Sequence, residues 1–447
     1  MRLEFEVPED ILHHLLDPVA IPHMARVRYD MTTPAPIDDI AASVNAAVRA
    51  ADGTTTIRSG QRIAVGVGSR GIGRLPAIVA ALVAALRALG AEPFIVPAMG
   101  SHGGATASGQ REVLEHLGVT EQSVGAPIVS GMETVEIGRA DDGTPVRLDR
   151  NALDADGIVF VARIKPHTAF RGRYESGLAK MVAIGLGKQA GAALTHARGF
   201  GHMAAMVPAM AAVALAHAPI RFAIGVIENA HDQPYKIVGV PAARILVDEP
   251  ALLDEARRAM PRIPFDQLDV LVIDEIGKNI SGDGADPNIT GRYPTPDASG
   301  GPIVTKQVVL DLTEATGGNA NGLGAADFTT VRAARKMNLG ATYPNALTST
   351  VARPVALPMI LPSDRLAFAA ALLTCNAVGR EPRLLRIKNT LSLSQLSVST
   401  ALLDDVTTNS ALRVMGEPAP VAFDAGGNLA DLAAAQSPAL AGAHRGH

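Results

Sequence analysis

Apolar runs of strand length alternate with longer stretches of helical periodicity along most of the chain. Runs rich in Val, Ile and Leu, bounded by polar or Gly residues, predict strands at 62–68, 92–99, 157–164, 221–227, 269–273 and 308–312. Segments that repeat apolar residues at helical spacing predict helices at 75–89, 109–117, 202–217, 250–260, 326–337 and 363–377. Strands that alternate with helices indicate an α/β fold with largely parallel sheets.

The residues that directly follow the predicted strands are polar, ionisable or Gly. They read GSRG (68–71), GSHGG (100–104), KPHT (165–168), ENAHD (228–232) and EIGKN (275–279). In open α/β sheets, ligands bind outside the carboxyl ends of the strands. We therefore expect the functional site at this edge, and the roles of Glu228, Asn229 and His231 stay open beyond polar lining.

The length of 447 residues favours two or three domains. Residues 277–302 are rich in Gly, Pro, Asn and Asp and are too long for an ordinary connection, so they form either a linker or a functional loop. We predict an N-terminal α/β domain over 1–265 and a C-terminal α/β domain over 266–431. A flexible, Ala-rich tail is expected over 432–447.

Composition narrows the class of partner. The formal charge of −4 and the pI near 6.3 give no basic excess, and no Lys/Arg run is present, so nucleic acid is not an expected partner. The opening MRLEFEVPED has no hydrophobic signal core, and the longest apolar runs, 75–86 and 203–216, are too short for a membrane span. We expect a cytoplasmic protein that does not associate with a membrane. Cys375 is the only cysteine, which excludes an intrachain disulfide and a cysteine-ligated cluster.

One segment combines features of a reactive site with those of a buried core. Residues 165–202 hold three of the 12 histidines, three lysines and seven glycines among apolar residues. Lys180 lies between the apolar residues Leu178 and Met181, and a lysine in such surroundings loses its charge more easily and can act as a nucleophile or covalent anchor. Lys188 is interpreted as a lysine whose ammonium group reaches solvent.

Histidines at strand ends are the candidate acids and bases. His102 is flanked by Ser and Gly without apolar cover, and His167 follows a buried strand. Because imidazole titrates near neutral pH, either ring could exchange a proton with a substrate or bind a metal. A zinc centre at His102, His167 and His196 is an alternative, although the chain has no H-E-x-x-H motif. Lys278 follows a later strand and is a candidate to bind a substrate carboxylate.

The segment GVGSRG (66–71) matches G-x-G-x-x-G between a predicted strand and a helix. Glycines there let backbone N–H groups approach a phosphate, and Arg70 could pair with it. A dinucleotide enzyme also needs an acidic residue at the end of the next strand, whereas Glu92 lies at its start. Phosphate binding is therefore favoured over NAD binding, and an NAD-dependent oxidoreductase is kept as an alternative function.

The order of these motifs resembles the nickel-dependent lactate racemase family: GSR, then GSHGG, then PH with a downstream Lys and His. The resemblance runs from Gly66 to His202 and extends more loosely to the strand end near Lys278. It implies two α/β domains with the site in the cleft between them. It also implies a nickel pincer nucleotide, a pyridinium mononucleotide derivative attached covalently to a lysine, whose nickel is held by the pincer and by one histidine.

The resemblance assigns a role to each reactive residue. Lys180 corresponds to the covalent anchor and His196 to the nickel ligand, and their spacing agrees with the family. His102 and His167 correspond to paired acid/base groups on either face of the substrate. Inverting a 2-hydroxy acid by moving its C2 hydrogen as hydride requires a base for the hydroxyl proton, and histidine suits both protonation states.

The remaining contacts implied by the resemblance involve the cofactor phosphate and the substrate carboxylate. Ser69 and Arg70 correspond to the loop that meets the cofactor phosphate or the substrate, and Lys278 to the residue that holds the carboxylate. The function implied is a racemase or epimerase of a small-molecule 2-hydroxy acid, with cofactor-building enzymes as partners in maturation. A relative that binds a nucleotide or metabolite without turnover is the other alternative.

Overall fold

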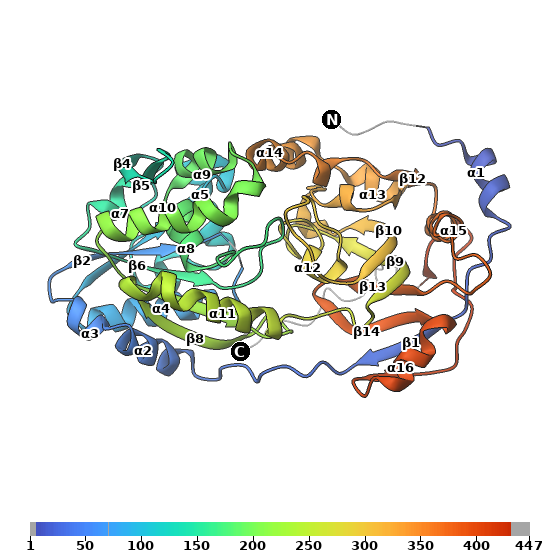
Figure 1. The fold of residues 1–447 in the computed structure, drawn as a ribbon, viewed down its shortest axis with the longest axis horizontal. Coiled ribbons are helices and arrows are strands. Elements are labelled where there is room, and N and C mark those ends of the chain that lie inside the picture. The colour runs from blue at the N-terminus through green and yellow to red at the C-terminus, as the bar shows by residue number, and fades with distance from the viewer. Residues whose placement is uncertain (1–5, 70, 431–447) are drawn as a thin grey trace. The chain divides into compact units, whose positions relative to one another are not determined.

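The computed structural model describes residues 6–69 and 71–430 of the chain (Figure 1). The chain divides into two compact units, and each is assembled from separate segments of the sequence. We call them the central unit, which comprises Thr33–Pro261 and Thr295–Ser299, and the terminal unit, which comprises Met1–Thr32, Arg262–Pro294 and Gly300–His447. The tail predicted over 432–447 lies outside the described residues.

The central unit is built on a sheet with the strand order β3-β2-β6-β7-β8. Its strands are β2 (Arg62–Val67), β3 (Glu92–Pro97), β6 (Gly157–Arg163), β7 (Ile220–Glu228) and β8 (Pro234–Pro241), and a separate hairpin contains β4 (Thr134–Arg139) and β5 (Pro145–Asp149). β3, β2, β6 and β7 run parallel, while β8 pairs antiparallel with β7. The carboxyl ends of neighbouring strands therefore meet at one edge of this sheet.

Helices cover the sheet of the central unit. They are α2 (Ile40–Ala50), α3 (Gly53–Thr56), α4 (Leu75–Ala88), α5 (Ala107–His116), α6 (Glu121–Val124), α7 (Arg150–Leu153), α8 (Leu178–Lys180), α9 (Lys188–His196), α10 (Met203–His217) and α11 (Ile245–Ala259). A π-helical turn over Met181–Gly185 continues α8. One hydrophobic core packs Val44 of α2 and Leu82 of α4 with Ile63 of β2. Because β2 is buried along nearly its whole length, it is a continuous apolar run rather than an alternating one.

The terminal unit contains a mixed sheet with the order β12-β11-β10-β9-β13-β14-β1-β15. Its strands are β1 (Met24–Tyr29), β9 (Gln267–Ile276), β10 (Ile303–Leu312), β11 (Phe328–Thr330), β12 (Met359–Leu361), β13 (Leu384–Asn389), β14 (Ser392–Ser399) and β15 (Leu412–Val414). The neighbouring strands β12, β11, β10, β9 and β13 run parallel to one another. The pairs β13–β14, β14–β1 and β1–β15 are antiparallel. Its helices are α1 (Glu9–Leu16), α12 (Pro287–Thr290), α13 (Val331–Lys336), α14 (Leu339–Ser349), α15 (Asp364–Thr374) and α16 (Leu403–Thr408).

The predicted fold class is confirmed: the chain forms two α/β units with largely parallel sheets. The sequence-based helix over 326–337 is wrong in its first half, where β11 precedes α13. Phe328 and Thr329 instead pair with β10, and the Thr330 side chain accepts the N–H of Ala333 and so caps the helix that follows.

Within the described residues, one helical stretch, Phe200–His217, is long and apolar enough to cross a membrane by length and composition alone. It contains α10, which packs in the central unit against α8 and β4. The side chains that face this packing, among them Met203, Val207 and Met210, are buried. The stretch therefore serves as a core helix of the α/β unit.

Candidate functional site

The polar strand ends of the central unit lie at one edge, as the parallel pairing requires. Ser69 follows β2, His102 follows β3 and His167 follows β6, and these three strands are neighbours in the sheet. The Ser69 hydroxyl is in hydrogen-bond contact with Nδ1 of His102, whose side chain is exposed. Arg70 lies outside the described residues.

His167 and Lys180 form a close pair at this edge. His167 Nε2 and Lys180 Nζ lie 2.6 Å apart. The backbone N–H of Ala169 donates to Nδ1 of the same ring at 3.0 Å, so Nδ1 carries a lone pair. In a neutral imidazole the proton must then sit on Nε2, which donates it towards Nζ. This tautomer fits an uncharged amine at Lys180, and an uncharged amine is a nucleophile.

His196, the last residue of α9, belongs to the same neighbourhood. Its ring centroid lies 5.6 Å from that of Phe200, which is 6.0 Å from the ring of His167. Burial lowers the pKa of His196 to about 4, and Lys180, when charged, acts in the same direction. The imidazole is therefore neutral at physiological pH, which is the form that binds a metal.

The buried carboxylate of Glu175 holds the backbone of the His167 loop. It accepts the N–H of His167 at 2.7 Å and that of Gly172 at 3.1 Å. Arg257 of α11 pairs with it at 2.6 Å. The sequence gives little signal for this role, because Glu175 lies in a loop and its partners are known only from the fold.

Lys188 is buried, so the prediction that its ammonium group reaches solvent is wrong. Its side chain is 0% exposed and pairs with Asp149 at 3.1 Å. Burial lowers the pKa of Lys188 and raises that of Asp149, while the charge of each group partly offsets the shift in the other. Lys188 Nζ also donates to Gln110 Oε1 at 3.0 Å, and Gln110 Nε2 donates to the carbonyls of Gly100 at 2.8 Å and His102 at 3.3 Å. This buried network supports the loop that carries His102.

The glycines of GVGSRG permit close packing. A Cβ at Gly68 would lie 2.9 Å from Cε of Met181, in the π-helical turn that follows Lys180. A Cβ at Gly66 would lie 3.0 Å from the Cβ of Phe160. The following helix begins at Leu75, some residues beyond the motif, rather than at its last glycine. Packing thus explains the first two glycines, and phosphate binding by this loop stays a prediction.

The cluster after β7 is structural. Glu228 pairs with Arg163 at 2.7 Å and accepts the N–H of Gly73 at 2.6 Å. Asn229 accepts the N–H groups of His231 and Gln233, which closes its own turn. The ring of His231 is exposed. These contacts fix loops next to the site and give none of the three residues an evident chemical role.

Lys278 lies in the terminal unit, where it follows β9. Its Nζ donates to the carbonyl of Gly282 at 2.6 Å, which folds the side chain over its own loop. The same carbonyl accepts from Asn321 at 2.9 Å. Binding of a substrate carboxylate by Lys278 therefore stays a prediction.

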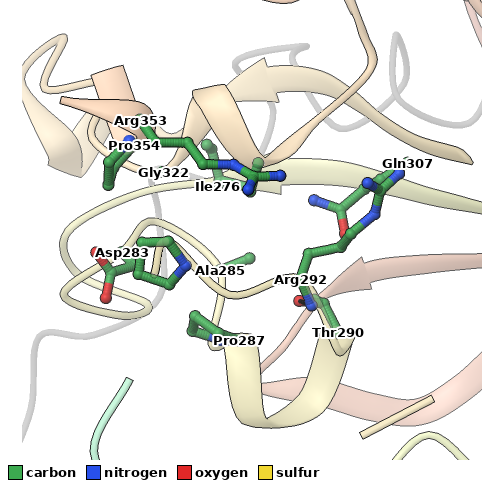
Figure 2. A pocket seen from close by; sticks show the side chains of 12 residues that line it. Ile276, Asp283, Ala285, Pro287, Thr290, Arg292, Gln307, Gly322, Arg353 and Pro354 are labelled. Carbon is green, nitrogen blue, oxygen red and sulfur yellow. Dashed lines mark hydrogen bonds between the residues drawn. The ribbon is translucent and has the colours of Figure 1, made fainter. Parts of the chain in front are cut away.

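A small cavity lies in the same unit, and Figure 2 shows Arg292, Gln307 and Arg353 around it. Its volume is about 10 Å³, room for roughly one water molecule. None of the residues predicted for the site lines it. The cavity is too small for a 2-hydroxy acid.

Among residues 6–69 and 71–430, no group of three or more His, Cys, Asp or Glu side chains is arranged to hold a metal ion. The zinc centre considered at His102, His167 and His196 therefore has no assembled ligand set in this structure. A metal held mainly by a cofactor and by one histidine would not require such a group.

Residues 17–207 match the family model of the lactate racemase N-terminal domain. Among solved structures, the lactate racemase apoprotein from Thermoanaerobacterium thermosaccharolyticum is similar to this chain with a TM-score of 0.48 and 11% identity, over 87% of this chain and 96% of that one. No curated protein sequence matches. The matched segment includes the candidate residues Ser69, His102, His167, Lys180 and His196.

Proposed function

Because this chain is a relative of the lactate racemase family through residues 17–207, we propose that it is a racemase or epimerase of a 2-hydroxy acid. The cofactor in this proposal is a nickel pincer nucleotide attached to Lys180. The observation that carries the proposal is the 2.6 Å pair of His167 and Lys180, in which the Ala169 N–H orients the ring so that the lysine amine is uncharged.

The donor set fits the cofactor. A covalent anchor needs a nucleophilic amine, which Lys180 supplies. A borderline metal such as nickel binds a neutral imidazole well, and His196 is held neutral by burial. When bound, the cofactor supplies an electrophilic pyridinium carbon that accepts hydride from the substrate.

The two strand-end histidines move the hydroxyl proton in this proposal. His167 Nε2 faces Lys180. With the amine held in a covalent bond, Nε2 would face the substrate hydroxyl instead. To act there as a base, the ring has to carry its proton on Nδ1, which means that the hydrogen bond from the Ala169 N–H is given up. His102, after the neighbouring strand end and in contact with Ser69, serves the opposite face. Each ring is then the base for one enantiomer and the acid for the other.

The charged residues position the substrate and cofactor. Ser69 and Arg70 meet the cofactor phosphate or the substrate, and Lys278 binds the substrate carboxylate as a point charge. Ser69 and Arg70 belong to the central unit, and Lys278 belongs to the terminal unit. The partners are the small-molecule substrate and the cofactor-building enzymes, in the cytoplasm.

The test is a screen of chiral 2-hydroxy acids on protein co-produced with cofactor-building enzymes. We expect optical activity to be lost for at least one acid, without any added nicotinamide cofactor. Turnover that depends on added NAD would identify an oxidoreductase instead. A loaded protein that inverts none of the acids would favour a binding protein without turnover.

A further inference from the structure

Glu249, on α11, is a buried carboxylate that the proposed reaction does not use. Its side chain is 0% exposed. Its Oε2 accepts the backbone N–H of Ala179 at 2.7 Å, and the backbone N–H of Leu178 also bonds to the carboxyl group. These two amides open α8, the short helix that ends at Lys180. The first backbone N–H groups of a helix have no acceptor within the helix, and Glu249 supplies one for α8.

Gly177 is shaped to admit this carboxylate. A Cβ at Gly177 would lie 2.0 Å from Oε1 of Glu249. The backbone of Gly177 is extended, with φ at 179°, so any residue could adopt it. Space for Glu249, rather than backbone freedom, is thus what the glycine in ESGLAK provides. Oε1 is buried and has no hydrogen-bond partner among the described residues.

The same helix fastens the rest of the loop that carries the reactive pair. Arg257 of α11 pairs with Glu175, which holds the backbone of His167. The Tyr174 hydroxyl donates to the carbonyl of Leu246 at 2.5 Å. That carbonyl has no helical donor because the residue four positions on is Pro250, which lacks an N–H. Both members of the pair thus lie on a segment attached to α11 at several points.

We propose that Glu249 is a positioning residue that, from α11, fixes the start of α8 and thereby sets the placement of the Lys180 amine. The inference rests on the proposed function only in the role of the Lys180 amine as the cofactor anchor. The contacts on which the inference is based involve only residues of this chain.

Glu249 can change its ionisation state near neutral pH. Burial raises its pKa to about 7, against the opposing effect of the N–H groups of Ala179 and Leu178. None of the charged side chains on the elements packed against α11 forms an ion pair with Glu249 within the described residues. These side chains are Lys180 on α8, Arg221 and Glu228 on β7, Lys236 on β8 and Arg244 in the turn before α11.

The sign of the effect follows from the raised pKa. The folded protein favours the protonated carboxyl group, so its contribution to stability is present at low pH and is lost as pH rises through about 7. Above that pH the carboxylate is charged next to the start of α8.

The experiment is residue-resolved competitive acylation with acetic anhydride across pH 6 to 9, on the full chain without cofactor, read by peptide mass spectrometry. The variants are Glu249→Gln, which keeps an acceptor for Ala179 but cannot ionise, and Glu249→Ala, which removes it. The matched control is Glu255→Gln, which removes a carboxylate from the same helix where it pairs with Lys236 at 2.7 Å. Lys306 in the terminal unit serves as the internal reference.

We expect Lys180 to react equally in the wild type and in Glu249→Gln below about pH 6, where the protonated carboxyl group and the amide both accept the N–H of Ala179. Glu249→Ala should change Lys180 acylation at every pH, because the acceptor at the start of α8 is lost, and Gln should restore the low-pH value. Glu255→Gln should match the wild type throughout. Identical Lys180 acylation in the wild type and in folded Glu249→Ala would overturn the inference, whether or not Lys180 carries a cofactor, which mass spectrometry of loaded protein decides separately.

Discussion

Two buried carboxylates of the terminal unit differ from Glu249 of the central unit in their partners. Asp274 pairs with Arg386 at 2.7 Å, and Asp364 pairs with Arg332 at 2.7 Å. Glu249, on α11, bonds to the backbone amide of Ala179 instead. A guanidinium stays charged at physiological pH and favours the ionised carboxylate, although burial still raises the pKa of Asp364. Burial raises the pKa of Glu249 to about 7, so its protonation can change near neutral pH.

Other buried carboxylates of the central unit form ion pairs: Glu175 pairs with Arg257 at 2.6 Å, and Asp149 pairs with Lys188 at 3.1 Å. The pair of Lys188 and Asp149 is fully buried and is linked through Gln110 to the loop that carries His102. Such a pair contributes little net stability over an apolar replacement of the pair, but removing one partner leaves a buried charge. The pair therefore connects the His102 loop to the interior of the central unit.

The largest expected effect comes from breaking that pair. Lys188→Met leaves Asp149 buried without its partner, so we expect the free energy of unfolding to fall by about 3–5 kcal/mol. The matched change in the terminal unit is Lys336→Met, where Lys336 pairs with Asp311 at 3.0 Å and with the exposed Glu314 at 2.9 Å. There we expect a loss of about 1 kcal/mol or less. Urea unfolding of both variants tests the difference, and equal losses would refute it.

The second largest effect is expected on the rate of substrate inversion. His102→Ala and His167→Ala should each lower inversion by roughly 10² or more in both directions, the usual scale for general acid–base groups. Nickel content and the mass increment on Lys180 should remain, since neither ring anchors the cofactor. Racemisation assays on loaded variants provide the measurement. Near-normal inversion in a fully loaded variant would remove that histidine from the mechanism.

A smaller effect is expected in the terminal unit. Lys278→Ala should raise KM about tenfold or more, because a hydrogen bond to a charged group contributes about 1.5–3 kcal/mol. Cofactor attachment should be unchanged. Steady-state kinetics with the substrate found in the screen tests this, and an unchanged KM would assign carboxylate binding elsewhere.

The sequence predicts β2, β3, β6, β7, β9 and β10 because these buried strands are continuous apolar runs, and it places Ser69, His102 and His167 at strand ends. It does not predict the parallel strands β11, β12 and β13, and β11 lies inside a predicted helix. It does not predict that β1 joins β14, since that pairing links Met24 to Ser399 and no local pattern encodes it. The two units therefore alternate along the chain instead of following one another.

Local sequence patterns also do not predict the supporting residues of the site. Lys188 begins a helix and looks like an ordinary exposed lysine, yet Asp149 and Gln110 from distant elements enclose it. Glu249 looks like one of several acids on an amphipathic helix, and only the packing of α11 against α8 shows that it is buried. In contrast, the apolar neighbours of Lys180 are a local pattern, and the prediction of a reactive amine is based on them.

The most direct test of Lys180 as the cofactor anchor is the intact mass and nickel content of protein co-produced with cofactor-building enzymes. The wild type should carry a mass increment located on the peptide that contains Lys180, together with nickel. Lys180→Ala and Lys180→Arg should lose the increment, because neither side chain provides a nucleophilic amine. His196→Ala should keep the increment but bind less nickel. The same increment on Lys180→Ala, or an unmodified wild type that still inverts its substrate, would contradict the assignment.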